Sequence, residues 1–164
     1  MNNFSKIIFA FILFFLVFNV KSYSEIVDKV DVEGNQRISL ETIVIFGDIT
    51  LGKNYESEDI NLLIKKLYDT TFFSNISVKL QNGLLSISVV ENPIINTIIF
   101  KGEKAKKYQE AILERLTLRE KSSFIENNIK SDINLIIAFY RSLGFYFVKI
   151  DAEIQNLEKN RVNL

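Results

Sequence analysis

The sequence predicts an α+β protein made of two tandem copies of one small domain, each with the element order β-α-α-β-β. The first observation is an internal repeat, in which the pattern of LYDTTFFSNISVKL (residues 67–80) returns as FYRSLGFYFVKIDAEI (residues 139–154). The second is the dipeptide Asn82-Gly83 between two alternating apolar runs, which is typical of a type I′ hairpin. The third is a pair of amphipathic helical patterns in each copy. We therefore expect each copy to be a three-stranded mixed sheet covered on one face by two antiparallel helices.

Residues 1–24 have the pattern of a secretory signal peptide. Lys6 precedes an apolar-dominated run over residues 7–20, and the small residues Ser22 and Ser24 follow. This run is shorter than the roughly 20 residues that a membrane span needs. We predict cleavage after Ser22 or Ser24 and a mature protein outside the cytoplasm, with a retained membrane anchor as the alternative.

Residues 25–92 are expected to form the first domain. Apolar alternation predicts a strand over residues 25–33, and Ser39 and Ser57 are suitable N-caps for the two helices that follow. The second helix shows one apolar face at helical spacing, formed by Ile60, Leu63, Ile64 and Leu67.

The two strands of the first hairpin follow an aromatic pair. Phe72 and Phe73 are adjacent, so one is expected to fill the space between helix and sheet while the other covers the helix end. The hairpin is antiparallel, and two antiparallel helices cover one face. The first strand must therefore lie parallel to the last.

Residues 93–164 are expected to form the second domain. Pro93 cannot continue the preceding ladder and keeps Asn92 extended, which predicts a short, semi-rigid boundary. A strand is predicted over residues 95–101. The first helix of this second domain is expected to carry an apolar face formed by Tyr108, Ala111, Ile112 and Leu116.

The end of the second domain repeats the pattern of the first. Ser123 and Glu126 have the spacing of a capping box, and Gly144 is expected to end the helix as a left-handed cap. A strand over residues 147–154 and a hairpin loop over 156–160 follow. Residues 161–164 read as the start of a third strand, so we interpret this copy as incomplete, with most of its last strand cut.

Composition argues against catalysis. The chain has no histidine and no cysteine, which removes the commonest base, thiol nucleophile and soft metal ligands. No glycine-rich phosphate loop is present. We therefore predict no enzyme, with no catalytic, metal-binding or cofactor-binding residues. The formal net charge is zero, so the chain lacks the excess of basic residues that is typical of nucleic-acid-binding proteins.

The remaining functional feature is a sheet with exposed edges. One hairpin strand in each copy is expected to have a single partner, so its other edge offers N–H and C=O groups to an incoming extended segment. The candidate binding residues on these edge strands are Ile76, Ser77, Val78, Lys79, Leu80, Gln81, Val148, Lys149, Ile150, Asp151 and Ala152. An edge blunted by Lys79 or Lys149, with no binding role, is the alternative.

The chain resembles the first and second polypeptide-transport-associated (POTRA) domains of the BamA family of outer-membrane protein assembly factors. The resemblance is carried by the Gly34–Ile38 run GNQRI, the Phe72-Phe73 pair and the VENP junction over residues 90–93, in this order and spacing. The family places glycine before the paired aromatics, where this chain has Thr71.

This resemblance implies a function and partners. It implies periplasmic domains, attached to the family's own C-terminal barrel in the outer membrane, that receive unfolded outer-membrane β-barrel proteins and scaffold the lipoproteins of the assembly complex. Two alternatives remain. One is a POTRA pair of a related two-partner secretion or translocation-and-assembly pore. The other is a membrane-anchored POTRA structural protein.

Overall fold

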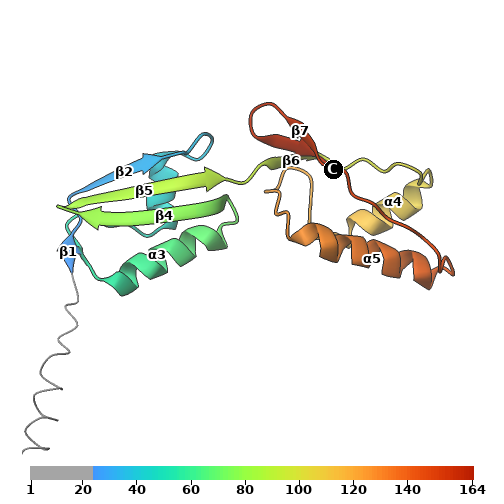
Figure 1. The fold of residues 1–164 in the computed structure, drawn as a ribbon, viewed down its shortest axis with the longest axis horizontal. Coiled ribbons are helices and arrows are strands. Elements are labelled where there is room, and N and C mark those ends of the chain that lie inside the picture. The colour runs from blue at the N-terminus through green and yellow to red at the C-terminus, as the bar shows by residue number, and fades with distance from the viewer. Residues whose placement is uncertain (1–23) are drawn as a thin grey trace, which may run out of the picture.

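The computed structural model describes residues 24–164, which fold into two consecutive units joined by a short connection (Figure 1). The predicted signal peptide and its Ser22 cleavage position lie outside the described residues. Within residues 24–164, no helix is long and apolar enough to cross a membrane.

The first unit contains seven elements in the predicted order, with two short strands added. Their bounds are β1 Glu25–Ile26, β2 Lys29–Glu33, α2 Leu40–Phe46, β3 Asn54–Tyr55, α3 Ser57–Asp69, β4 Phe73–Gln81 and β5 Leu84–Glu91. The strand predicted over residues 25–33 is broken at Val27-Asp28. Val27 is fully buried there, and β1 pairs with β3 instead of continuing β2.

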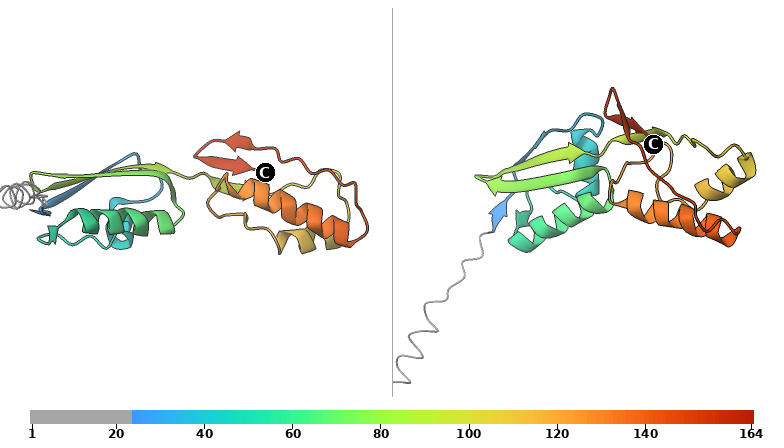
Figure 2. Two further views of the ribbon diagram at one scale, coloured as in Figure 1. Left: turned by 60° about the horizontal axis from the view of Figure 1, so that its bottom comes forward. Right: turned by 45° about the vertical axis from the view of Figure 1, so that its right-hand side comes forward.

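The main sheet of the first unit has the order β2-β5-β4. β2 runs parallel to β5 and β4 runs antiparallel to it, which confirms the predicted mixed topology. Asn82 and Gly83 have φ of 53° and 76°, the left-handed pair that a type I′ turn requires. Helices α2 and α3 both lie on one face of this sheet (Figure 2).

The core of the first unit lies between this sheet and its helices. Its fully buried members come from both layers and include Ile43, Leu63, Leu67, Leu85 and Ile87. Phe73 is buried, whereas Phe72 is half-buried and packs edge-on against Phe46 at the end of α2. The aromatic pair is therefore divided as the sequence predicts.

The second unit repeats the arrangement with shorter strands. Its elements are β6 Ile94–Thr97, α4 Lys106–Leu113, α5 Asn128–Ser142, β7 Gln155–Leu157 and β8 Arg161–Asn163. The sheet order is β6-β8-β7, with β8 parallel to β6 and antiparallel to β7. Its core is smaller and contains Ile95, Leu118, Phe124 and Val162.

Helix starts were predicted less well than helix interiors. Ser39 caps α2 as expected, because its hydroxyl accepts a hydrogen bond from the Thr42 N–H. Glu56, not Ser57, is the N-cap residue of α3, and its backbone N–H donates to the Asp59 carboxylate at 3.0 Å. Asp59 and Glu58 in the first turn also complement the helix dipole.

The start of α5 also differs from the sequence prediction. The capping box predicted for Ser123 and Glu126 is wrong, because α5 begins only at Asn128. Ser123 instead forms a β-bridge with Ile94. The bridge holds Ser123 beside the sheet, so the chain turns once more before the helix can start.

Candidate functional site

The edge of β4 is the first candidate site. β4 pairs with β5 alone among the strands of residues 24–164, so its other side faces outward. In a two-residue hairpin the residues flanking the turn, Gln81 and Leu84, form a hydrogen-bonded pair, and bonded and non-bonded pairs then alternate. The backbone N–H and C=O groups of Ile76, Val78 and Leu80 consequently point away from β5.

The predicted residues on β4 occupy the positions that the alternation indicates. Ile76 is buried and Val78 and Leu80 are half-buried toward the helices, whereas the side chains of Ser77, Lys79 and Gln81 are exposed. The structure therefore confirms that these six residues form a strand at a sheet edge.

Part of this edge is already occupied by a side chain that sequence reasoning missed. The hydroxyl of Tyr68, on α3, accepts a hydrogen bond from the Ile76 N–H at 3.1 Å. This contact leaves the outward groups of Val78 and Leu80 for an added strand. Tyr68 lies in the last turn of α3, and the loop over residues 70–72 and the first residues of β4 separate it from Ile76.

The second predicted edge strand is wrong. Residues 147–154 form no strand. The first strand of the hairpin is instead β7, which overlaps the loop that was predicted over residues 156–160. β8 pairs with β7 only as far as Gln155, so within the described chain the preceding residues have no neighbouring strand. The residues predicted as an edge, Val148, Lys149, Ile150, Asp151 and Ala152, instead line a groove.

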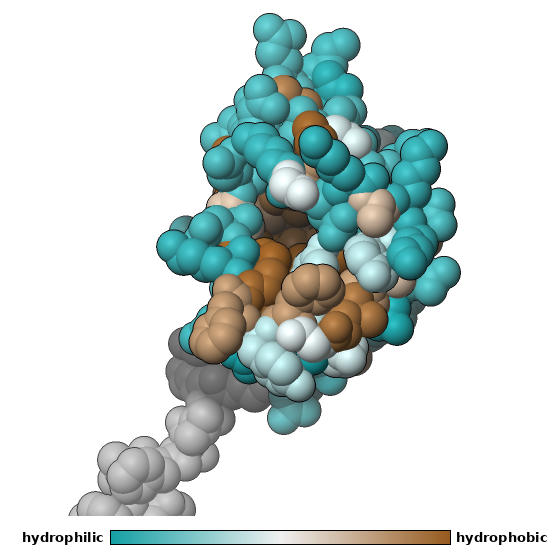
Figure 3. All heavy atoms as spheres, turned by 90° about the vertical axis from the view of Figure 1, so that its right-hand side faces the viewer, coloured by the Kyte–Doolittle hydropathy of each residue, from teal (hydrophilic) through white to brown (hydrophobic). Residues whose placement is uncertain are grey.

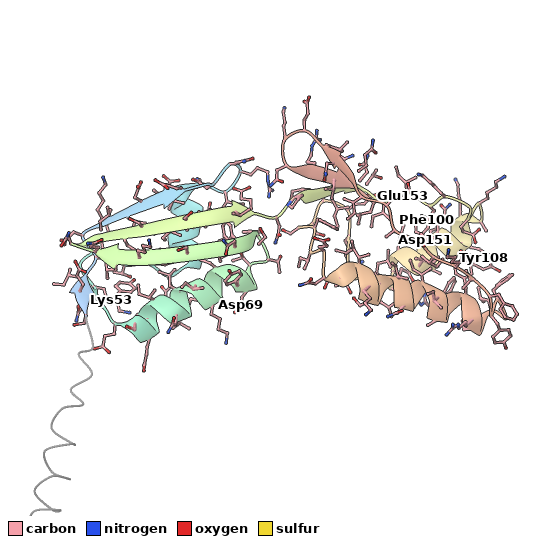
Figure 4. All side chains as sticks on the ribbon, viewed as in Figure 1. Lys53, Asp69, Phe100, Tyr108, Asp151 and Glu153 are labelled. Carbon is pink, nitrogen blue, oxygen red and sulfur yellow. The ribbon has the colours of Figure 1, made fainter. Side chains whose placement is uncertain are left out.

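This groove is the second candidate site and has a volume of about 610 Å³. Its walls are residues 98–101 and residues 148–153, and its floor is apolar, built by α4, α5 and the intervening loop. Figure 3 shows a hollow with hydrophobic atoms inside and polar atoms around its mouth. Phe100, Asp151 and Glu153 lie around the groove, with Tyr108 farther along the unit (Figure 4).

Polar groups at the groove are largely satisfied by the protein itself. The buried carboxylate of Asp132 accepts the N–H groups of Thr117 and Leu118, both at 2.9 Å. The Tyr140 hydroxyl donates to Glu103 at 2.7 Å, and burial together with this carboxylate raises the pKa of Tyr140 to about 12. Tyr140 is therefore neutral at physiological pH, and the groove offers mainly apolar contact and unpaired backbone.

The third feature is the junction between the two units. The Glu91 side chain is 1% exposed, and its Oε1 accepts the N–H groups of Gln36, Arg37 and Ile38 at 2.7–2.9 Å. Its Oε2 lies 3.1 Å from Nε of Arg37. Burial alone would raise the pKa of Glu91, but these three N–H donors and the Arg37 charge hold it below its usual value.

Groups of three or more His, Cys, Asp or Glu residues able to hold a metal ion are absent from residues 24–164. The geometry of the described residues thus offers strand edges and an apolar groove. Strand edges and apolar grooves are surfaces at which proteins in general bind extended or helical polypeptide.

Comparison with known proteins relates the chain to POTRA domains and to BamA proteins. The family model POTRA, described as "Surface antigen variable number repeat", matches residues 93–164. The outer membrane protein assembly factor BamA of Neorickettsia risticii is 24% identical over 142 residues, covering 87% of this chain. BamA of Neisseria meningitidis serogroup B is 26% identical over 141 residues, covering 84%. The second unit thus matches a POTRA family model, and most of the chain is similar to BamA proteins.

Solved structures show that the POTRA fold extends over both units. POTRA1-2 of the periplasmic domain of Omp85 from Anabaena aligns with a TM-score of 0.50 at 15% identity, covering 87% of this chain and 94% of that one. The N-terminal domain of Omp85 from Thermosynechococcus elongatus aligns with a TM-score of 0.55 at 13% identity, covering 86% and 61%. The chain spans about a fifth of the length of the curated BamA relatives, 19% and 18% respectively.

Proposed function

We propose that this POTRA region lies in the periplasm, at the inner side of the outer membrane, as part of a β-barrel assembly factor. There it receives unfolded outer-membrane β-barrel proteins as added strands and scaffolds the lipoproteins of the assembly complex. The relatives are named outer membrane protein assembly factors, which supports a role in outer-membrane protein assembly. The Anabaena structure is named as part of a periplasmic domain, which supports a location in the periplasm. The factor's own C-terminal barrel would supply the membrane part.

The outward edge of β4 is the observation that carries this proposal. The N–H and C=O groups of Val78 and Leu80 point away from β5, and pairing through the main chain depends little on the sequence of the added strand. Such an edge suits a client range of many unfolded β-barrel chains. Binding of this kind needs no reacting group, which agrees with a proposed role without catalysis.

The lipoprotein part of the proposal uses a different surface. Ile45 is 74% exposed at the end of α2, and Leu51 is 60% exposed in the following loop. Contiguous exposed apolar side chains mark protein interfaces, and we propose that Ile45 and Leu51 contribute to one such surface. Ile45→Glu should therefore reduce co-purification of the lipoproteins and leave client binding at β4 unchanged.

A single fluorophore on β4 tests the client-binding site. The chain has no cysteine, so Lys79→Cys creates one labelling position on the strand, and Lys65→Cys creates a matched position on the exposed side of α3. An outer-membrane β-barrel protein unfolded in urea and diluted into buffer is the probe. We expect its addition to change the emission of the label at position 79 and not at position 65.

A proline variant separates edge pairing from simple proximity. Val78→Pro removes an outward N–H and leaves the β4–β5 ladder intact, whereas proline at Ser77 would break that ladder. The change at position 79 should disappear in the Val78→Pro background while circular dichroism stays unchanged. An unchanged response in the folded Val78→Pro variant would contradict strand addition at this edge.

A further inference from the structure

An exposed aromatic loop follows helix α5 at the outer end of the second unit (Figure 1). Gly144 ends the helix with a φ of 91°, a left-handed conformation that turns the chain sharply away from the helix axis. The next three residues, Phe145, Tyr146 and Phe147, are 55%, 69% and 100% exposed. Soluble proteins rarely expose contiguous apolar side chains unless another surface covers them in some functional state.

The internal repeat shows that the fold does not require aromatic side chains in this loop. In the alignment of the two repeats, Tyr146 occupies the position of Ser74. Phe147 likewise occupies the position of Asn75. Both polar residues are exposed in the first unit, although the loop just before them accepts hydrogen bonds from Asn92 at the junction. The fold therefore exposes these two positions in both units, and the second unit fills them with aromatic rings.

The start of α4 lies beside the aromatic loop. The Tyr140 hydroxyl donates to Glu103 at 2.7 Å, and the Phe145 ring packs edge-on against Tyr140 with the ring centres 6.1 Å apart. The Tyr108 ring lies 6.5 Å from Tyr140 and carries the Lys107 ammonium group 4.9 Å from its centre. The lysines at the start of α4 and the aromatic loop thus belong to one continuous surface.

This surface has an excess of positive charge. Residues 102–107 and 139–149 together contain five basic residues and one acidic residue, and the acidic one is Glu103, already bonded to a tyrosine. The basic residues are all exposed and are Lys104, Lys106, Lys107, Arg141 and Lys149. The corresponding segments of the first unit, 34–39 and 67–77, contain one basic and one acidic residue. The positive charge, like the exposed aromatic rings, is therefore particular to the second unit.

We propose that this aromatic tip, formed by residues 143–147 with Lys104, Lys106 and Lys107, docks onto a lipid bilayer that contains anionic phospholipid. Aromatic rings insert among the headgroups and upper acyl chains of a bilayer, and lysine ammonium groups pair with lipid phosphates. The tip lies on the second unit, apart from β4 and from Ile45. The inference is therefore independent of the proposed client binding and of the proposed lipoprotein surface.

The shape of the tip favours a bilayer over a nucleic acid or an acidic protein. Residues 145–147 protrude, and none of them is among the residues that line the groove. Single-stranded nucleic acid is usually held in a basic groove with stacking platforms, whereas a fluid bilayer accommodates protruding rings at any spacing. An acidic polypeptide would pair with the lysines and leave the fully exposed Phe147 in water.

Sedimentation with lipid vesicles tests the electrostatic part of the proposal. The vesicles contain equal parts of phosphatidylcholine and phosphatidylglycerol, and vesicles of phosphatidylcholine alone are the reference. The tip variant combines Lys104→Gln, Lys106→Gln and Lys107→Gln. A control variant with the same change in net charge combines substitutions at exposed lysines of the first unit, Lys29→Gln, Lys65→Gln and Lys79→Gln.

The parent chain should sediment with the anionic vesicles and not with the neutral ones. The tip variant should bind the anionic vesicles about a hundredfold more weakly, and the control variant should bind like the parent. No binding of the parent, or equal losses in the two variants, would overturn the proposal.

A double variant tests the contribution of the rings. Tyr146→Ser with Phe147→Asn introduces the residues that the first unit carries at the same exposed positions, so the fold should be retained, as circular dichroism would verify. Its binding to anionic vesicles should be weaker by about tenfold or more. Ile45→Ser with Leu51→Asn removes two exposed apolar side chains from the first unit and should leave binding unchanged. Parent-like binding of the folded tip variant would contradict insertion of the rings.

A single tryptophan distinguishes insertion from adhesion. The chain has no tryptophan, so Phe147→Trp places one reporter at the tip and Ile45→Trp places one at an exposed position of the first unit. Anionic vesicles should shift the emission of the reporter at position 147 to shorter wavelength, and brominated phosphatidylcholine should quench it. The reporter at position 45 should show neither change. An unshifted reporter at position 147 in sedimenting protein would overturn the proposal.

Two soluble polyanions test the other classes of partner with the same reporter. Single-stranded oligothymidine represents a nucleic acid, and polyglutamate represents an acidic polypeptide. Neither should change the emission at position 147. A change with either polyanion that equals the change with vesicles would overturn the assignment to a bilayer and indicate that class of partner instead.

Discussion

The hydroxyl oxygen of Tyr68 accepts a hydrogen bond from the backbone N–H of Ile76 at 3.1 Å. One residue of α3 thereby covers a donor on the outward edge of β4. Native proteins commonly protect edge strands from unwanted pairing, and this contact is a local form of that protection. It limits an added strand to the part of β4 nearer the hairpin turn.

Removing this side chain should lengthen the edge that is available to clients. Tyr68→Ala releases the Ile76 N–H, and one additional hydrogen bond contributes about 1 kcal/mol, or roughly fivefold in affinity. The measurement is titration of an unfolded β-barrel protein against the label at position 79. Tyr146→Ala, which removes an exposed tyrosine from the second unit, serves as the control and should leave the affinity unchanged.

Replacing Glu91 should destabilise the first unit and change its pH dependence. Glu91→Gln keeps an acceptor for the Gln36, Arg37 and Ile38 N–H groups but loses the charge that pairs with Arg37, at a cost of about 2 kcal/mol at pH 7. Urea unfolding measures the difference, and Glu58→Gln on the surface of α3 is the control with no such partners.

The sign of the pH effect follows from the lowered pKa of Glu91. A folded-state pKa below the ordinary 4.5 means that its ionisation stabilises the fold fully above that value. This contribution is lost as pH falls through 4.5 toward the lowered folded-state pKa. The difference between the parent and Glu91→Gln should therefore shrink below pH 4.5, and a constant difference down to acid pH would contradict this account.

Gly34 cannot carry a side chain. It has φ of +84°, and a Cβ atom would lie 2.1 Å from the Val89 carbonyl oxygen. Gly34→Ala should cost more than about 3 kcal/mol, because backbone must move to accept it. Gly102→Ala shares the positive φ, at +93°, but meets nothing within 4 Å, so its cost should be only about 1 kcal/mol. Equal losses in thermal unfolding would argue against the clash.

Thr71 is a strained residue that glycine should relieve. Its φ is +61°, a rare conformation for a β-branched side chain. Thr71→Gly should stabilise the chain by about 0.5–1 kcal/mol, since relief of strain exceeds the entropic cost of glycine.

The neighbouring position provides the control for this change. Thr70 has φ of −68°, and its hydroxyl donates to the Leu67 carbonyl at 2.6 Å and accepts from the Phe72 N–H at 3.2 Å. Thr70→Gly should therefore destabilise the chain, and a gain in Tm for both variants would refute the strain argument.

Much of the fold was predictable because its signals are local. The hairpin dipeptide Asn82-Gly83 and the helical spacing from Ile60 to Leu67 act over a few residues, and the parallel pairing of β2 with β5 follows from them. The strand predicted over residues 147–154 failed for the opposite reason. Its alternation is real, but a strand also needs a neighbour, and β8 does not reach that far along it.

The candidate site likewise has a part that the sequence predicts and a part that it does not. The six residues of β4 could be predicted from alternation and the hairpin turn. The Tyr68 contact could not, because it depends on how α3 lies against the sheet edge. Tyr140 occupies the position of the second repeat that corresponds to Tyr68, yet it bonds to Glu103, so the repeat alone does not predict the partner.

The junction between the units has a mechanical consequence. Only Asn92 and Pro93 separate β5 from β6, and this joint is held from both sides. The Arg37 side chain donates to the Asn92 carbonyl at 3.0 Å, and the Asn160 side chain donates to the Glu91 carbonyl at 3.1 Å. These two hydrogen bonds oppose bending at Asn92 and Pro93. We therefore expect a rotation of one unit to rotate the other with it.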